Sequence, residues 1–136
     1  MALIRVLLAD DHAALLAELQ FRLAQVFEII GSVEDGAQAV DAALRLAPDV
    51  LVLDISMPLM NGFKAAARLR DLNCKTRIVF LSAYDDQDYI AEAFSSGASA
   101  YVTKRTFSTD LVTAIRDVVL GKTFISPSLR SPLSTG

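Results

Sequence analysis

Short runs of apolar residues alternate along the chain with longer segments in which apolar residues recur at helical spacing. Uninterrupted apolar runs predict strands of a parallel sheet that is covered on both faces. The predicted strands are residues 4–9, 27–33, 50–53, 77–81 and 100–103. The predicted helices, bounded by polar caps, prolines and glycines, are residues 15–26, 35–46, 63–72, 86–96 and 109–120, the last of them capped by Ser108.

Five strand–helix units in succession predict an α/β fold with a doubly wound, five-stranded parallel sheet. The 136 residues suffice for one domain with its own core and are too few for two. From residue 122 the composition shifts toward serine and proline. We therefore expect a domain over residues 1–121 and a linker or C-terminal tail over 122–136, which either ends the protein or leads to a domain absent from this chain.

Composition excludes several classes of protein. A hydrophobic fraction of 53% with 21% charged residues argues against a disordered chain. No apolar run approaches the ~20 residues of a membrane helix, and the first residues do not resemble a secretory signal. One cysteine allows no disulfide within the chain, which indicates a reducing compartment and predicts a cytoplasmic protein without a membrane contact. A net charge of −3 without a basic stripe argues against direct DNA binding.

Polar residues stand directly after four of the predicted strands. Asp10 and Asp11 follow the first strand, Asp54 follows the third, Ser82 ends the fourth and Lys104 follows the fifth. A parallel sheet brings the carboxyl ends of its strands to one edge, where ligands bind in folds of this kind. Any one of these residues alone would be read as a helix cap, a turn residue or a surface charge. Their joint placement predicts a site.

The residue types of this group point to a cation and to phosphoryl chemistry. Crowded carboxylates repel one another, so three of them beside one lysine favour a bound cation. Mg²⁺ prefers oxygen ligands, and it would balance the two negative charges that remain after pairing with Lys104. The carboxylate of Asp54 could then attack a phosphoryl group and form an acyl phosphate. His12, next to the acid pair, is interpreted as a residue of the first helical turn.

Four segments, taken together and in order, resemble the signature of receiver domains of bacterial-type response regulators. They are Asp10-Asp11, the stretch Asp54-Ile55-Ser56-Met57-Pro58-Leu59-Met60-Asn61-Gly62, the triplet Leu81-Ser82-Ala83, and Tyr101-Val102-Thr103-Lys104. The resemblance covers about residues 4–121 and implies a flavodoxin-like receiver fold with strand order 2-1-3-4-5. Residues 111–127 are similar to the end of receivers in the NarL/FixJ subfamily, in which a helix-turn-helix DNA-binding domain usually follows a linker.

The resemblance also implies a role for each residue of the site. Asp54 is the expected phosphoacceptor, Lys104 pairs with the phosphoryl group, and Ser82 and Tyr101 form the switch that responds to it. The implied ligands of Mg²⁺, for which Mn²⁺ could substitute, are Asp10, Asp11, Asp54 and the backbone carbonyl of Ser56. Two positions depart from the family pattern. Ser82 stands in place of the usual threonine, and Arg105 stands where proline commonly follows the lysine, often after a cis peptide bond.

The expected function is a phospho-accepting signalling module rather than an enzyme, with only self-phosphorylation from small donors and autodephosphorylation as activities. The expected partners are a sensor histidine kinase or phosphotransfer protein, a second copy of the chain on phosphorylation, and DNA through an output domain that is absent here. The expected output is control of transcription by phosphoryl transfer, as in a two-component system or phosphorelay.

The sequence is also compatible with other functions. One is a degenerate or stand-alone receiver that acts by protein–protein binding. Another is an Mg²⁺-dependent phosphatase with an Asp nucleophile, although such enzymes usually carry a second Asp where this chain has Ser56. A flavin-binding protein of similar topology would need a Ser/Thr/Gly-rich phosphate loop after the first strand, where this chain has Asp-Asp-His-Ala-Ala.

Overall fold

The predicted succession of strands and helices is confirmed in a computed structural model of the chain, which describes residues 3–130. The strands are β1 (Arg5–Ala9), β2 (Glu28–Val33), β3 (Val50–Leu53), β4 (Arg77–Ser82), β5 (Ala100–Thr103) and β6 (Phe124–Ile125). The helices are α1 (Ala13–Leu23), α2 (Gly36–Leu46), α3 (Gly62–Asp71), α4 (Gln87–Ser95), α5 (Phe107–Val119) and the short 3-10 turn η1 (Pro127–Leu129). No helix within residues 3–130 is both long and apolar enough to cross a membrane.

All strands pair in parallel in one sheet with the order β2-β1-β3-β4-β5-β6. The predicted order 2-1-3-4-5 is confirmed, and β6 adds a sixth, two-residue strand at the β5 edge. The sequence missed β6 because two apolar residues within a Ser/Pro-rich segment do not make a recognisable strand pattern. Of the predicted tail, residues 124–129 form β6 and η1, while 131–136 lie outside the described residues.

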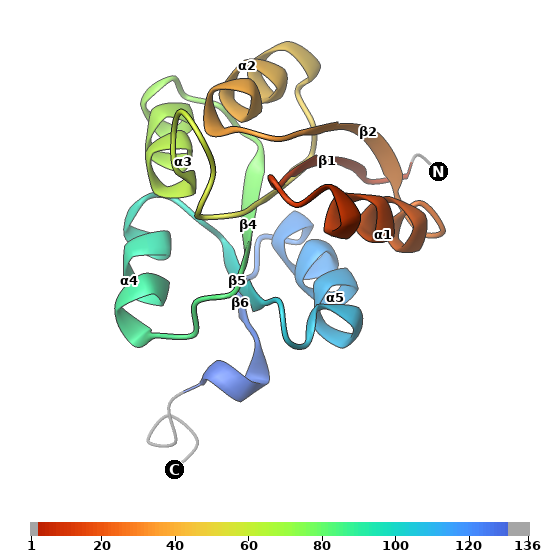
Figure 1. The fold of residues 1–136 in the computed structure, drawn as a ribbon, viewed down its shortest axis with the longest axis vertical. Helices are drawn as coiled ribbons and strands as arrows, with labels where there is room; N and C mark the ends of the chain where they lie inside the picture. Colours follow the sequence, from red (N-terminus) through yellow and green to blue (C-terminus); the bar gives the residue numbers. More distant parts are fainter. Residues whose placement is uncertain (1–2, 131–136) are drawn as a thin grey trace.

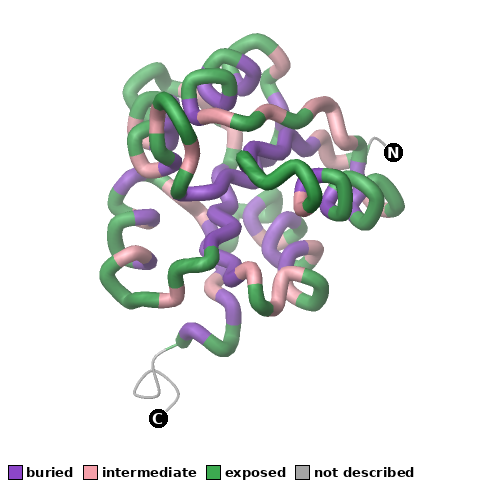
Figure 2. Tube along the Cα trace, viewed as in Figure 1, coloured by how far each residue is buried: buried purple, intermediate pink, exposed green. Residues whose placement is uncertain are grey.

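The sheet is covered by helices on both faces (Figure 1). Helices α2, α3 and α4 pack on one face, and α1 and α5 pack on the other. Successive residues of β1 and β3 point to opposite faces, so Leu7 and Leu51 belong to the first core whereas Leu8 and Val52 belong to the second. Figure 2 shows the buried residues running through the centre between these layers. The double cover explains why the strand sequences are apolar without alternation.

The helix starts agree with the sequence in one case and differ in another. Asp35 caps α2 by accepting a hydrogen bond from the Gln38 N–H at 2.7 Å, as the capping pattern predicts. The predicted cap Ser108 is wrong, because α5 begins two residues earlier and follows Thr106. The Thr106 hydroxyl donates to the Asp110 carboxylate at 2.5 Å, so Thr106 and Asp110, rather than Ser108, form a side-chain hydrogen bond at the start of this helix.

Gly62, the first residue of α3, lies against the strand end that carries Asp54. Its N–H donates to the Ile55 carbonyl at 2.7 Å, and a Cβ at this position would collide with the Asp54 backbone carbonyl and the Phe80 ring. The Asn-Gly pair therefore permits the close approach of helix α3 to the site.

Gly62→Ala is expected to lower the free energy of unfolding by about 1–3 kcal/mol, because the backbone at Asp54 must shift to accept the methyl group. Chemical denaturation of the variant measures this loss. Gly121→Ala is a useful contrast, since no neighbouring atom lies within 4 Å of the added Cβ. Any loss of stability in that variant comes from the positive φ of 84° alone. A Gly62→Ala protein with the free energy of unfolding of the wild type would contradict the close packing of Gly62 against Asp54 and Phe80.

Candidate functional site

The carboxyl ends of the strands bring the predicted polar residues to one edge of the sheet. Ala9 pairs with Leu53 in β3, β3 pairs with β4, and Ser82 of β4 pairs with Thr103, so the residues that follow β1, β3 and β5 emerge at the same edge of the sheet. Backbone hydrogen bonds continue past the strand ends, from the Asp54 N–H to the Ala9 carbonyl at 3.0 Å and from the Lys104 N–H to the Ser82 carbonyl at 2.8 Å. The spatial grouping expected from the sequence is therefore present.

Lys104 lies between two buried carboxylates. Its Nζ is 3.0 Å from Asp10 Oδ2 and 3.2 Å from Asp54 Oδ2, and the two acids are only 2% and 3% exposed. The other oxygen of Asp54, Oδ1, accepts a hydrogen bond from the Ile55 N–H at 2.8 Å. One ammonium group shared by two desolvated carboxylates leaves a net negative charge at the centre of the site.

Oxygen ligands of the carboxylates converge in a way that fits a divalent cation. Carboxylate oxygens of Asp10, Asp11 and Asp54 lie within 4.8 Å of one another, together with a ring nitrogen of His12. Asp10 Oδ2 is buried and accepts no well-aligned hydrogen bond despite its contact with Lys104, so it has bonding capacity for a second cation. Asp11 is exposed and open to solvent. This hard oxygen set suits Mg²⁺.

His12, which the sequence interpretation placed in the first helical turn, lies beside the acid pair in this group. Its Nδ1 lies 3.0 Å from Asp10 Oδ1 and 3.2 Å from Asp11 Oδ1, while its backbone N–H donates to Asp10 Oδ1 at 2.9 Å. It precedes α1 as the cap residue, which accounts for the bond to its backbone. The position of His12 directly after the acid pair in the sequence indicates that its ring lies close to these carboxylates.

The electrostatics of the site are dominated by burial. Burial and the neighbouring Asp10 carboxylate raise the pKa of Asp54 above its ordinary value of 3.8, although Lys104 and the Ile55 N–H act in the opposite direction. Burial alone would lower the pKa of Lys104, but the attraction of Asp54 and Asp10 outweighs it and leaves that pKa raised. Lys104 is therefore charged at neutral pH, whereas ionised Asp54 is destabilised by its surroundings.

Asp54→Asn is expected to raise the unfolding temperature in the absence of divalent cations. A raised carboxyl pKa means that the ionised form costs stability in the folded state, and the amide removes that charge. The gain should be largest near neutral pH and should shrink as the pH falls toward 3.8, where the unfolded carboxyl takes up its proton. Thermal unfolding across this pH range tests it, with the exposed Asp71→Asn as control; a lower unfolding temperature for Asp54→Asn would contradict the cause assigned to the shift.

The two predicted switch residues lie beside this charged group rather than within it. Ser82 is fully buried, and its Oγ accepts a hydrogen bond from the Tyr84 N–H at 2.9 Å. Tyr101 is also fully buried, and its hydroxyl donates to the Tyr84 carbonyl at 2.5 Å. Burial raises the pKa of Tyr101 to about 12, so its hydroxyl remains a donor at neutral pH. Both residues therefore hold the backbone of Tyr84, in the loop between β4 and α4.

A hollow of about 620 Å³ opens next to the charged group and is lined by residues that include Asp11, Ser56 and Tyr84. The Ser56 hydroxyl and the Tyr84 hydroxyl are 3.1 Å apart, and the Tyr84 ring stacks on Tyr89 with centroids 4.4 Å apart. The side chain of Ser56 is thus at the rim of the hollow. The ligand role of its backbone carbonyl stays a prediction.

Arg105 occupies the position where the resemblance leads one to expect proline. All peptide bonds within residues 3–130 are trans, including the one between Lys104 and Arg105. The Arg105 N–H, which proline would lack, donates to Thr103 Oγ1 at 3.2 Å. Its guanidinium donates from Nε to Asp85 Oδ2 at 2.7 Å, so the loop after β5 is tied to the loop after β4. Sequence reasoning missed this pair.

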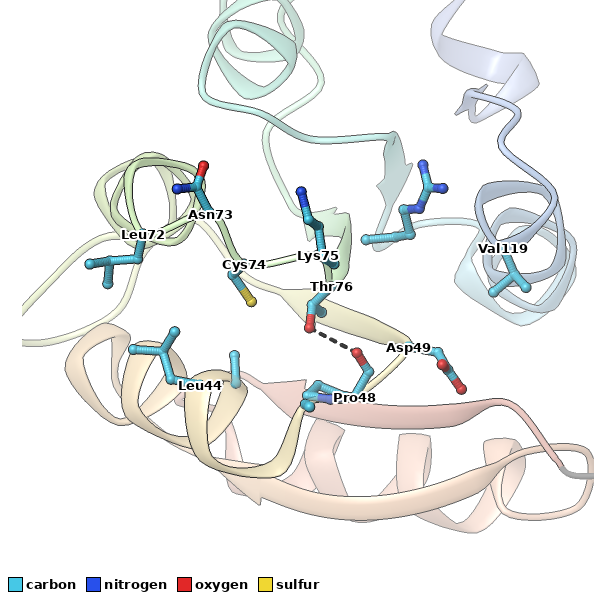
Figure 3. Close-up of a pocket in the computed structure, with 12 residues that line it drawn as sticks. Leu44, Pro48, Asp49, Leu72, Asn73, Cys74, Lys75, Thr76 and Val119 are labelled. Atoms are coloured by element: carbon cyan, nitrogen blue, oxygen red, sulfur yellow. Dashed lines mark hydrogen bonds between the residues drawn. The ribbon is translucent and has the colours of Figure 1, made fainter.

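A second hollow, of about 490 Å³, lies at the opposite end of the sheet (Figure 3). It is formed where β3 and β4 begin, and Thr76 Oγ1 donates to the Pro48 carbonyl across it at 2.8 Å. Its charged lining residues are Asp49, Lys75 and Arg77. It holds no group of convergent carboxylates, so the chemistry predicted from the sequence belongs to the other edge.

The comparison with known families agrees with this geometry. Residues 6–116 match the family described as the response regulator receiver domain. The chain is 31% identical to the oxygen regulatory protein NreC of Staphylococcus epidermidis over 132 residues, and 33% identical to the probable transcriptional regulatory protein NarL of Mycobacterium tuberculosis over 129 residues. These alignments cover 95% and 93% of this chain and 61% and 59% of the relatives, so the chain spans about three fifths of their length.

Solved structures show the same fold. A two-component response regulator of the LuxR family from Aurantimonas sp. SI85-9A1 superposes with a TM-score of 0.89 at 25% identity, covering 95% of this chain and 93% of that one. The response regulator domain of Thermotoga maritima CheB gives a TM-score of 0.81 at 29% identity, covering 87% and 97%. The fold, the arrangement of the acidic edge and the family match lead to one conclusion: the chain belongs to the response regulator receiver domain family.

Proposed function

We propose that Asp54 accepts a phosphoryl group from a sensor histidine kinase or phosphotransfer protein, and that the resulting change of state controls transcription through a DNA-binding domain outside this chain. The observation that carries the proposal is the placement of Lys104 between the buried carboxylates of Asp10 and Asp54, at 3.0 and 3.2 Å, on the open edge of the sheet. A family of phosphoacceptor signalling domains and relatives named as transcriptional regulators support it.

In the transfer step, a carboxylate oxygen of Asp54 would attack phosphorus in line with the leaving group. A P–O bond to Asp54 forms while the P–N bond to the donor imidazole breaks, and the departing nitrogen keeps the bonding electron pair. Lys104 would move its contact from Asp54 Oδ2 to the transferring phosphoryl oxygens. A bound Mg²⁺, or Mn²⁺ in its place, would neutralise charge on the same oxygens, held by Asp10, Asp11, Asp54 and the Ser56 carbonyl.

Phosphorylation would then act on the loop between β4 and α4. The phosphoryl group adds about one negative charge and three acceptor oxygens to the site. The Ser82 hydroxyl, which accepts from the Tyr84 N–H at 2.9 Å, would turn its own proton toward a phosphoryl oxygen. The Tyr101 hydroxyl, already bonded to the Tyr84 carbonyl, would hold the loop in this arrangement. The phosphoryl group favours one loop state and shifts the population toward it.

The output would depend on partners of the whole protein. Phosphorylation is proposed to favour a homodimer, and DNA contact is proposed to come from a following domain, in line with the length of the relatives. Small donors such as acetyl phosphate should phosphorylate Asp54 without a kinase, and the acyl phosphate should hydrolyse slowly on its own. Multiple-turnover phosphatase activity is disfavoured, because Ser56 stands where such enzymes usually carry a second Asp.

The direct test is incubation with acetyl phosphate and Mg²⁺, followed by intact-mass measurement of the wild type and of Asp54→Ala. We expect a gain of one phosphoryl group that requires Mg²⁺, is removed by alkali or hydroxylamine, and is lost in the variant. Asp71→Ala, which removes an exposed acid, is the matched control and should behave as wild type. No mass gain in the wild type would identify a degenerate receiver that acts by binding alone.

A further inference from the structure

The segment of residues 124–130, here called the C-terminal strap, is joined to the loop that carries Lys104. Its strand β6 pairs with β5 through Phe124 and Ile125, and the Ser126 N–H donates to the Tyr101 carbonyl at 3.0 Å. Figure 1 shows the strap continuing from β6 past the ends of α4 and α5. The strap thus makes backbone contact with the strand that leads directly into Lys104.

The centre of this junction is the Ser126 side chain, which is completely buried. Its hydroxyl donates to Asp110 Oδ2 at 2.7 Å and accepts from the Thr103 N–H at 3.1 Å. Asp110 also accepts from the Thr106 hydroxyl, at 2.5 Å. The loop over 103–106, which contains Lys104, is therefore held at both ends by a network that is complete only when Ser126 is in place.

The rest of the strap is anchored to the other side of the switch region. Leu129 is 6% exposed and packs in the same core cluster as Tyr101 and Ile90. The Gln87 side chain of α4 donates to the Leu129 carbonyl at 2.8 Å. The docked strap therefore contacts α4 and Tyr101 of the proposed switch as well as the loop that carries Lys104.

We propose that Ser126 is a positioning residue for Lys104, and that docking of the C-terminal strap and occupancy of the phosphoryl site favour each other. The inference rests on the proposed role of Lys104 in holding a phosphoryl group. A docked strap fixes the Lys104 loop in the arrangement that pairs with the site. By thermodynamic linkage, a phosphoryl group held by Lys104 must then stabilise the docked strap by the same factor. The strap would carry the signal toward whatever follows it in the chain.

Beryllofluoride with Mg²⁺, a mimic of the phosphoryl group, provides the probe. The chain has no tryptophan, and of its three tyrosines Tyr84 and Tyr89 lie between β4 and β5 while Tyr101 is in β5, so tyrosine fluorescence reports binding at the switch. Ser126→Ala leaves the buried Thr103 N–H without a partner and should weaken beryllofluoride binding about tenfold. Ser128→Ala, which alters an exposed serine of the same strap, should change the affinity for beryllofluoride less than about twofold.

Amide hydrogen exchange of the wild-type chain supplies the reciprocal measurement and needs no variant to fold. Beryllofluoride should slow exchange of the strap amides at residues 126 and 129 by about the same factor of ten, whereas a purely structural serine would produce no response. Unchanged or faster exchange in the loaded protein, or equal affinity of Ser126→Ala and wild type, would overturn the coupling. Failure of the wild type to bind beryllofluoride would instead overturn the proposed function on which the coupling rests.

Discussion

Lys104→Ala is expected to slow phosphorylation of Asp54 by acetyl phosphate about 10²- to 10³-fold, the loss typical of removing one preorganised charge-stabilising group from a transition state. The Nζ of Lys104 lies 3.2 Å from the Asp54 oxygen and 3.0 Å from the Asp10 oxygen, so it can follow the charge that develops on the phosphoryl group. Its raised pKa keeps it protonated throughout the neutral range. The measurement is the initial rate of phosphoprotein formation by mass spectrometry.

Two further variants separate the effect of position from that of charge. Lys104→Arg keeps the charge but replaces a compact ammonium by a planar guanidinium, so we expect a phosphorylation rate between those of the wild type and Lys104→Ala. Lys75→Ala removes an exposed lysine near the opposite end of the sheet and should leave the rate unchanged. A Lys104→Ala protein that folds and is phosphorylated at the wild-type rate would remove Lys104 from the reaction.

Asp11→Asn is expected to weaken Mg²⁺ binding at least tenfold, which corresponds to about 1.4 kcal/mol. Asp11 is the exposed member of the three carboxylates, so its replacement removes a charged ligand without leaving a buried group unpaired. Asp10→Asn should weaken binding as well, but it also breaks the contact with Lys104 and is therefore a less selective probe. Calorimetric titration with Mg²⁺, repeated with Mn²⁺, measures the change.

The control for the metal site is Asp71→Asn, which removes a carboxylate far from the site in sequence and should leave Mg²⁺ affinity at the wild-type value. His12→Gln tests the imidazole that lies 3.0 and 3.2 Å from the two aspartates. Because nitrogen is a poor ligand for Mg²⁺, this variant should bind Mg²⁺ nearly as well as wild type. Undiminished Mg²⁺ binding by Asp11→Asn would contradict the ligand set.

The succession of strands and helices and the grouping of Asp10, Asp54, Ser82 and Lys104 could be predicted from the sequence because both follow from backbone geometry, whereas the strand order was implied by the resemblance to receiver domains. Apolar runs identify the buried strands, and a parallel sheet necessarily brings the residues at the carboxyl ends of those strands to one edge. The alternation of Leu7 and Leu8 between the two cores could also be expected once both faces are covered. None of these features depends on how an individual side chain turns.

The features that the sequence did not reveal depend on single side chains in loops. The ion pair of Arg105 with Asp85 joins residues from two different loops, and no periodic pattern relates their positions. The early start of α5 is accompanied by a hydrogen bond from the Thr106 hydroxyl to Asp110, which also accepts from Ser126, sixteen residues farther along the chain. β6 is held by the edge of β5 rather than by its own propensity. Such contacts are set by tertiary structure and have no local signal.

Reductive trapping distinguishes Asp54 from Asp10 and Asp11 as the residue proposed to carry the phosphoryl group. Borohydride reduces an aspartyl phosphate to homoserine, and peptide mapping by tandem mass spectrometry then locates the altered residue. We predict homoserine at position 54 after treatment with acetyl phosphate and Mg²⁺, and none when Mg²⁺ is withheld. Homoserine at position 10 or 11, or its absence from every position of a protein that has gained a phosphoryl group, would contradict the assignment.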